Sequence, residues 1–124
     1  MSKINYEEMA KDIYNFCVKY HMWDCCRIYF NNKAWTDSSK WNGKRGTLIA
    51  ENLYEYNNKD PRDYFEYGNP DTLSFSFEGF AYNIFNHYGE KVFMDANDEF
   101  YEMIKGYNCY FELGNSWNLT IIEN

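Results

Sequence analysis

The chain has 124 residues, enough for one domain with a single hydrophobic core, so no second domain is expected. Nineteen acidic residues against twelve lysines and arginines give a net charge of -7, which argues against a general affinity for nucleic acid because phosphate neutralisation dominates that binding. No stretch resembles a signal peptide or a membrane span, and we therefore expect a cytoplasmic protein that does not bind membranes.

The start of the chain predicts a helix followed by a hairpin. Asn5 and Glu8 have the spacing of a helix cap, and apolar residues follow at helical intervals, so we expect a helix over residues 6–21. Side chains then alternate on both sides of the turn at Asn31 to Lys33. This alternation predicts a β-hairpin over residues 25–36.

The middle of the chain predicts loops and two strands. Residues 36–46 are polar and contain two glycines, which indicates a loop, and a third strand is expected over residues 47–56. Asp-Pro at 60–61 suits the start of a short helical turn that ends at Gly68. Residues 73–77 then alternate large apolar side chains with polar ones, the pattern of a strand that is central to the core.

The end of the chain predicts two helices and a second hairpin. Apolar residues at helical spacing indicate a short helix over residues 80–88, and Asp95 with Asp98 can cap a third helix. Residues 107–113 and 117–122 form the hairpin. The expected fold is therefore a single α+β domain over residues 1–124, with a largely antiparallel sheet of about five to six strands, an N-terminal helix and two shorter helices.

Four cysteines and two histidines are the candidates for catalysis or metal binding. His21, Asp24, Cys25 and Cys26 lie close in sequence, but their spacing is not that of a zinc site, and free cysteines are often simply buried. A catalytic pair would need a cysteine to meet His21 or His87, which nothing in the sequence requires. No Glu-x-Lys nuclease motif or glycine-rich phosphate loop occurs. We expect reduced cysteines, no metal, no cofactor and no enzymatic activity.

Charge and aromatic residues are unevenly distributed. Residues 33–46 have a net charge of +3 and two tryptophans, which leaves -10 on the rest of the chain. Such a segment can bind a nucleic-acid strand, although a polar loop with one tryptophan anchored in the core is the favoured interpretation. Acidic residues recur over 63–71, among tyrosines, and over 95–102, and thirteen tyrosines are too many for all to be buried, so some face water or a partner. The candidate partner-binding residues are Asp63, Tyr64, Glu66, Tyr67, Asp71, Asp95, Asp98, Glu99, Glu102, Trp41, Lys44 and Arg45.

One block of sequence resembles a known group of proteins. The segments DYFEY (63–67), NPDTLS (69–74) and SFEG (76–79) are similar to a recurring block in small accessory proteins of bacterial mobile elements, including phages. Neighbours of those proteins often include anti-CRISPR and antirestriction proteins. The resemblance brings no catalytic residue with it. It implies a small acidic inhibitor that binds a host defence nuclease and blocks its nucleic-acid surface.

Three functional hypotheses follow. The leading one is a non-enzymatic inhibitor that binds a basic nucleic-acid-binding protein, such as a CRISPR effector nuclease, without itself contacting nucleic acid. The second is an immunity protein or antitoxin that neutralises a nuclease toxin. The third is a small enzyme that acts on a nucleotide or another small molecule in an aromatic pocket, using Cys25, Cys26 or His87.

Overall fold

The computed structural model describes residues 3–65, 68–78, 84, 91–115 and 117–124. Its elements in chain order are α1 (Tyr6–Lys19), β1 (Arg27–Phe30), β2 (Lys33–Thr36), β3 (Lys40–Trp41), β4 (Lys44–Arg45), β5 (Thr47–Ala50), β6 (Leu53–Asn57), the 3-10 turn η1 (Pro61–Asp63), β7 (Ser74–Ser76), α3 (Lys91–Lys105), β8 (Cys109–Asn115) and β9 (Asn118–Glu123).

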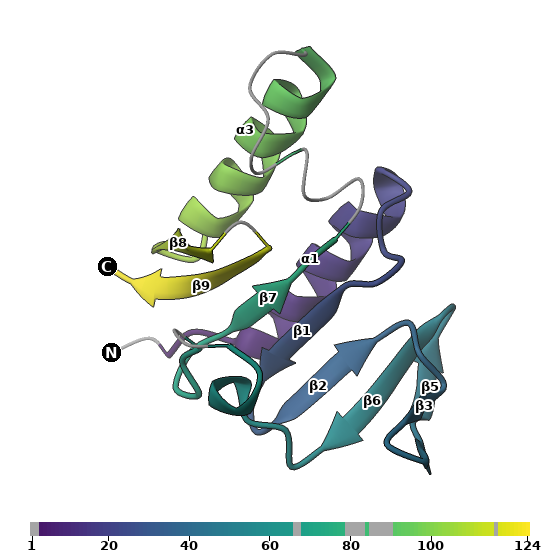
Figure 1. Ribbon diagram of the computed structural model, residues 1–124. Coiled ribbons are helices and arrows are strands. Elements are labelled where there is room, and N and C mark those ends of the chain that lie inside the picture. The colour runs from purple at the N-terminus through teal and green to yellow at the C-terminus, as the bar shows by residue number, and fades with distance from the viewer. Residues whose placement is uncertain (1–2, 66–67, 79–83, 85–90, 116) are drawn as a thin grey trace.

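Within these residues, seven strands form one antiparallel sheet in the order β5-β6-β2-β1-β7-β9-β8 (Figure 1). Strands β3 and β4 form a separate two-stranded hairpin. The predicted α+β class and antiparallel sheet are confirmed, but the sheet has more strands than the five or six that were expected.

The predicted N-terminal helix and first hairpin are confirmed. The side chain of Asn5 accepts a hydrogen bond of 3.0 Å from the backbone N–H of Glu8, so it caps α1 as its position suggested. Between β1 and β2, Asn31 and Asn32 both adopt positive φ angles, which asparagine tolerates better than most residues. This turn fixes the register in which Ile28 lies opposite Trp35.

Two predictions for the middle of the chain were wrong. The segment 36–46, which was expected to be a loop, contains the hairpin β3–β4, with positive φ angles at Asn42 and Gly43. The strand expected over residues 47–56 is two strands, β5 and β6, because the chain turns at Asn52, where φ is also positive. Leu48, Ile49 and Ala50 are consecutive apolar residues rather than an alternating row, so the pattern did not mark where the first strand ends.

The prediction for the third helix also needs correction. Helix α3 begins at Lys91, so Asp95 lies one turn inside it and forms an ion pair of 2.7 Å with Lys91 instead of capping the helix. With 15 residues, α3 is not shorter than α1, which has 14. The helix predicted over residues 80–88 lies outside the described residues except for Ile84, which is helical and buried. No helix in the described part of the chain combines the length and the apolar character needed to cross a membrane.

The sheet has two different faces. Ile28, Phe30 and Phe75 point to the side on which α1 and α3 pack, and they belong to the main hydrophobic core; we call this side the helix face. Tyr29 lies between Ile28 and Phe30 and therefore points to the opposite side. There it packs with Phe65 and other aromatic residues in a second cluster, and we call this side the aromatic face.

Strand β7 is central, as its sequence predicted, because it pairs with β1 on one edge and with β9 on the other. Its large residues, such as Phe75, lie on the helix face, whereas Ser74 and Ser76 lie on the aromatic face. Both serines are also buried, at 0% and 8% exposure, since the chain between β6 and β7 passes over that side. At β7 the aromatic face therefore presents the small polar side chains of Ser74 and Ser76 beneath the covering segment.

The C-terminal hairpin is confirmed and is tied to α1. In its register Phe111 lies opposite Ile121, as the pattern predicted. The Tyr6 hydroxyl donates a hydrogen bond of 2.6 Å to Glu123, and Tyr107 donates one to Asp12. These two contacts hold the first helix against the C-terminal hairpin and the turn that precedes it.

Candidate partner-binding site

One face of α3 points to solvent and carries acidic and apolar side chains together. Ala96, Phe100 and Ile104 are buried on the opposite side of the helix and fix its orientation on the core. Exposed positions recur every three or four residues and so form one continuous stripe along the helix. We call it the α3 stripe; it consists of Lys91, Met94, Asp95, Asp98, Tyr101, Glu102 and Lys105.

Two of the four acids predicted on this helix are engaged within the protein. Asp95 pairs with Lys91, and Glu99 lies beside the stripe, where it accepts hydrogen bonds from Lys19 at 2.7 Å and from the Tyr20 hydroxyl at 2.9 Å. The hydrogen bond from Lys19 lowers the pKa of Glu99 below its ordinary value. Glu99 therefore joins α3 to α1, and its role as a partner contact stays a prediction.

Asp98 and Glu102 are exposed and form no ion pair with any described residue. They alternate with Met94 and Tyr101, which are 50% and 49% exposed. An apolar or aromatic anchor between unpaired charges is typical of surfaces that bind another protein. The centre of the α3 stripe thus has the composition that was expected of a partner-binding site.

The second acidic segment begins on the aromatic face of the sheet, where Tyr64 packs. Asp60 caps η1 by accepting from the Arg62 backbone N–H at 2.9 Å, and its carboxylate also pairs with the Arg62 side chain at 2.7 Å. Asp63 and Asp71 are exposed, but the half-buried Tyr64 stacks on Tyr29 at a ring-centre distance of 5.2 Å.

Glu66 and Tyr67, which were also predicted as contacts, lie outside the described residues. Tyr64 packs on the aromatic face, whereas Asp71 lines a hollow of about 980 Å³ together with Tyr6 and Tyr107. The segment is therefore not one flat surface, and neither residue belongs to the α3 stripe.

The basic segment around Trp41 is organised by burial of its tryptophans. Trp35 and Trp41 are 2% and 8% exposed, so both are anchored in the core and neither presents an open ring for base stacking. Trp41 lies between two cations, since the Arg27 guanidinium carbon and the Lys59 Nζ atom are each 4.2 Å from its ring centre. Lys44 and Arg45, by contrast, are exposed, as the prediction requires.

The cysteines do not form an activated nucleophile in the described part of the chain. Cys17, Cys26 and Cys109 are buried and Cys25 is exposed, and no disulfide joins them. Burial, followed by the carboxylates nearby, raises the pKa of the Cys25 thiol, which keeps it protonated, whereas a nucleophile needs the opposite shift. His87 lies outside the described residues. Among the described residues, no group of three or more His, Cys, Asp or Glu is arranged to hold a metal ion.

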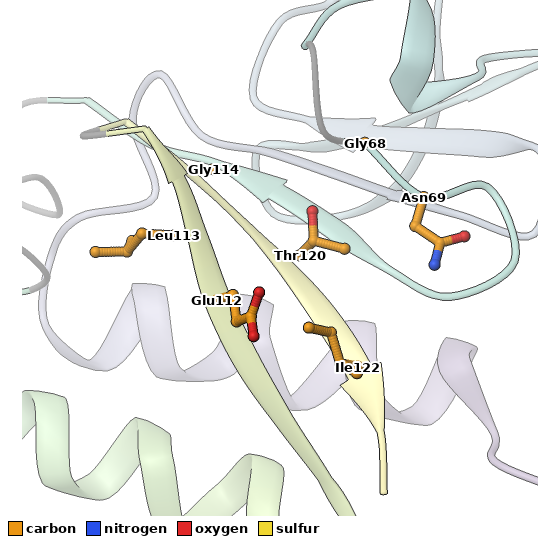
Figure 2. A pocket seen from close by; sticks show the side chains of 7 residues that line it. All are labelled: Gly68, Asn69, Glu112, Leu113, Gly114, Thr120 and Ile122. Carbon is orange, nitrogen blue, oxygen red and sulfur yellow. The ribbon is translucent and has the colours of Figure 1, made fainter.

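Two of the hollows that described residues line on the aromatic face were missed by sequence reasoning. One, of about 630 Å³, lies between Gly68 and Asn69 on one side and strands β8 and β9 on the other. Figure 2 shows Glu112, Thr120 and Ile122 on the side of the strands nearer Asn69, while Leu113 projects away from them. The other hollow, of about 380 Å³, lies over β1, β2 and β7. No sequence signal marks either of them, because each combines residues from distant parts of the chain.

Comparisons with other proteins add no relative. No family model matches this sequence, and neither a curated protein nor a solved structure matches it. What the chain does is therefore inferred from its own residues.

Proposed function

We propose that this protein is a non-enzymatic inhibitor that binds the basic, nucleic-acid-binding surface of a bacterial defence nuclease, such as a CRISPR effector. It uses the α3 stripe as its principal contact. Asp98 and Glu102 take the place of nucleic-acid phosphates against the partner's lysines and arginines, and Met94 and Tyr101 supply apolar contact between them.

The observation that carries this proposal is the coexistence of unpaired carboxylates and exposed apolar side chains on one rigid helix. Phe100 and Ile104 hold the helix on the core, so binding costs little ordering of the backbone. The net charge of -7 supports fast association with a basic partner. Aromatic and methionine side chains then contribute contact area that charge alone does not provide.

The acidic segment at Asp63 and Asp71 is not part of the contact in this proposal. Asp63 lies beside Tyr64 of the aromatic face, and Asp71 lines a hollow with Tyr6 and Tyr107, so neither residue belongs to the α3 stripe. This separation supplies a matched control, because the same charge change can be made on either surface while the net charge stays equal.

The experiment is a pull-down with purified CRISPR effectors, using the wild-type protein and two double variants. Asp98→Lys with Glu102→Lys should reduce capture at least tenfold, because reversal of charges that contact the partner costs several kcal/mol. Asp63→Lys with Asp71→Lys, which has the same net charge, should retain capture. If capture falls equally in both variants, only the net charge matters for binding. If capture falls in neither variant, α3 is not part of the interface. Capture of a nuclease toxin alone would favour the immunity-protein alternative.

A further inference from the structure

The hollow over β1, β2 and β7 has features of a binding site that the inhibitor proposal does not use. Its floor is formed by Arg27 and Tyr29 of β1 and by Ser76 of the neighbouring β7. Arg27 lies directly opposite Ser76 in the pairing of the two strands, so their side chains share this face. The hollow is on the other side of the sheet from the α3 stripe.

One end of the hollow is lined by two hydrogen-bond donors, Arg27 and Tyr29. Tyr29 is 1% exposed, and among the described residues its hydroxyl accepts no well-formed hydrogen bond and donates none, although the Arg27 side chain is near enough to act on it. Arg27 stacks on Trp41 and forms no ion pair with a described carboxylate. Burial raises the pKa of Tyr29 to about 12, although Arg27 lowers it, so the hydroxyl keeps its proton at neutral pH. These two side chains can therefore both donate to an anionic group such as a carboxylate.

The other end carries acceptors. Asp37 and Glu78 line the hollow, and both act electrostatically on the thiol of Cys25, which also lines it. One oxygen of Asp37 accepts the Cys25 backbone N–H at 3.2 Å, which fixes the position of this carboxylate. Neither acid forms an ion pair with a described residue. The hollow thus has a donor end beside Tyr29 and an acidic end beside Cys25.

The walls between these ends are aromatic. Tyr64, Phe65 and Trp117 line the hollow, and Phe65 meets Trp117 edge to face at a ring-centre distance of 5.9 Å. A volume of about 380 Å³ lies within the range of small-molecule sites, which combine apolar walls with a few polar groups that orient the ligand.

We propose that this hollow binds a free amino acid with an apolar or aromatic side chain, with its carboxylate on Arg27 and Tyr29 and its ammonium group toward Asp37 and Glu78. The aromatic walls then contact the amino-acid side chain. A simple anion leaves both acids unpaired in the site, and a simple cation leaves Arg27 and Tyr29 unpaired. Only a zwitterion satisfies both ends.

Cys25 provides the readout, because it is the one exposed thiol among the four cysteines and it lines the hollow. The rate at which iodoacetamide alkylates Cys25 is measured by intact-protein mass spectrometry in the presence of leucine, phenylalanine or tryptophan. At a concentration of about ten times Kd, the empty fraction falls about tenfold, so alkylation should slow by the same factor and saturably. Acetate and methylamine at equal concentrations should not slow it.

Substitutions test the donor end and the acidic end of the hollow one at a time. Arg27→Gln and Asp37→Asn should each abolish the protection, measured as the ratio of alkylation rates with and without the amino acid. Tyr29→Phe, which conserves the packing, should weaken protection at least severalfold, and it keeps the test valid if Arg27→Gln does not fold. The proposal is overturned if none of the three amino acids protects Cys25, if acetate or methylamine protects it equally well, or if protection survives in the variants. None of these outcomes bears on capture of a nuclease by α3.

Discussion

The hydroxyl of Tyr29 should lower the free energy of unfolding when no ligand occupies the hollow over β1, β2 and β7. A buried hydroxyl without a hydrogen-bond partner costs about 1–3 kcal/mol relative to water, and Phe has the same ring without that group. We therefore expect Tyr29→Phe to raise the free energy of unfolding by about 1 kcal/mol, at the lower end of this range because Arg27 lies nearby. The stacking of the ring on Tyr64 at 5.2 Å is unaffected by the substitution.

The same substitution at Tyr56 is the matched control. Tyr56 belongs to the same aromatic cluster, but its hydroxyl donates a hydrogen bond of 2.8 Å to the backbone oxygen of Ser38. Tyr56→Phe should therefore lower the free energy of unfolding by about 1 kcal/mol. Urea denaturation with an unchanged m-value measures both effects, and each corresponds to a shift in Tm of about 2–5 °C for a chain of this size. Destabilisation of similar size in both variants would refute the assignment of Tyr29 as unpartnered.

Three further substitutions test the packing and the electrostatics, each by equilibrium denaturation. Phe75→Ala should cost about 3–5 kcal/mol, because this fully buried ring lies in the central strand; a cost below about 1 kcal/mol would contradict its central position. Gly46→Ala should cost about 1–3 kcal/mol, since the added Cβ would lie 2.7 Å from the Tyr56 ring; a neutral effect would contradict that close approach. The pKa of Glu55 is lowered in the folded protein, chiefly by the hydrogen bond from Trp35. The ionised carboxylate therefore adds its full contribution to the free energy of unfolding above the unfolded pKa of about 4.3, and this contribution disappears as the pH falls through the lower folded pKa. Glu55→Gln should therefore be less stable than wild type at neutral pH but lose less stability on acidification, and an unchanged acid profile would count against this pairing.

The sequence predicted those elements whose signals are local. The cap at Asn5 and the hairpin turn at Asn31 depend on residues within a few positions of each other, and both are present. The alternation around Phe75 also predicted a central strand correctly. It did not reveal that Ser76 is buried as well, because the covering segment comes from elsewhere in the chain.

The predictions that failed concern turns without a pattern and contacts between distant residues. Asn52 reverses the chain with a positive φ angle, but the apolar run before it does not mark where one strand ends and the next begins. Glu99 was grouped with Asp98 as an exposed acid, but its partner Lys19 is 80 positions away, and no local pattern reports such a pair. The hollow over β1, β2 and β7 was missed for the same reason, since the aromatic residues that line it come from the middle and the end of the chain.

The most direct test of the inhibitor proposal is a competition titration with a captured effector nuclease. Binding of a fluorescent DNA or RNA target is measured by anisotropy at increasing concentrations of this protein. If the α3 stripe occupies the nucleic-acid surface, the apparent Kd for the target rises in proportion to the inhibitor concentration, and the variant with Asp98→Lys and Glu102→Lys has no such effect. A ternary complex, in which the nuclease binds this protein and the target together with unchanged affinities, would contradict the proposal.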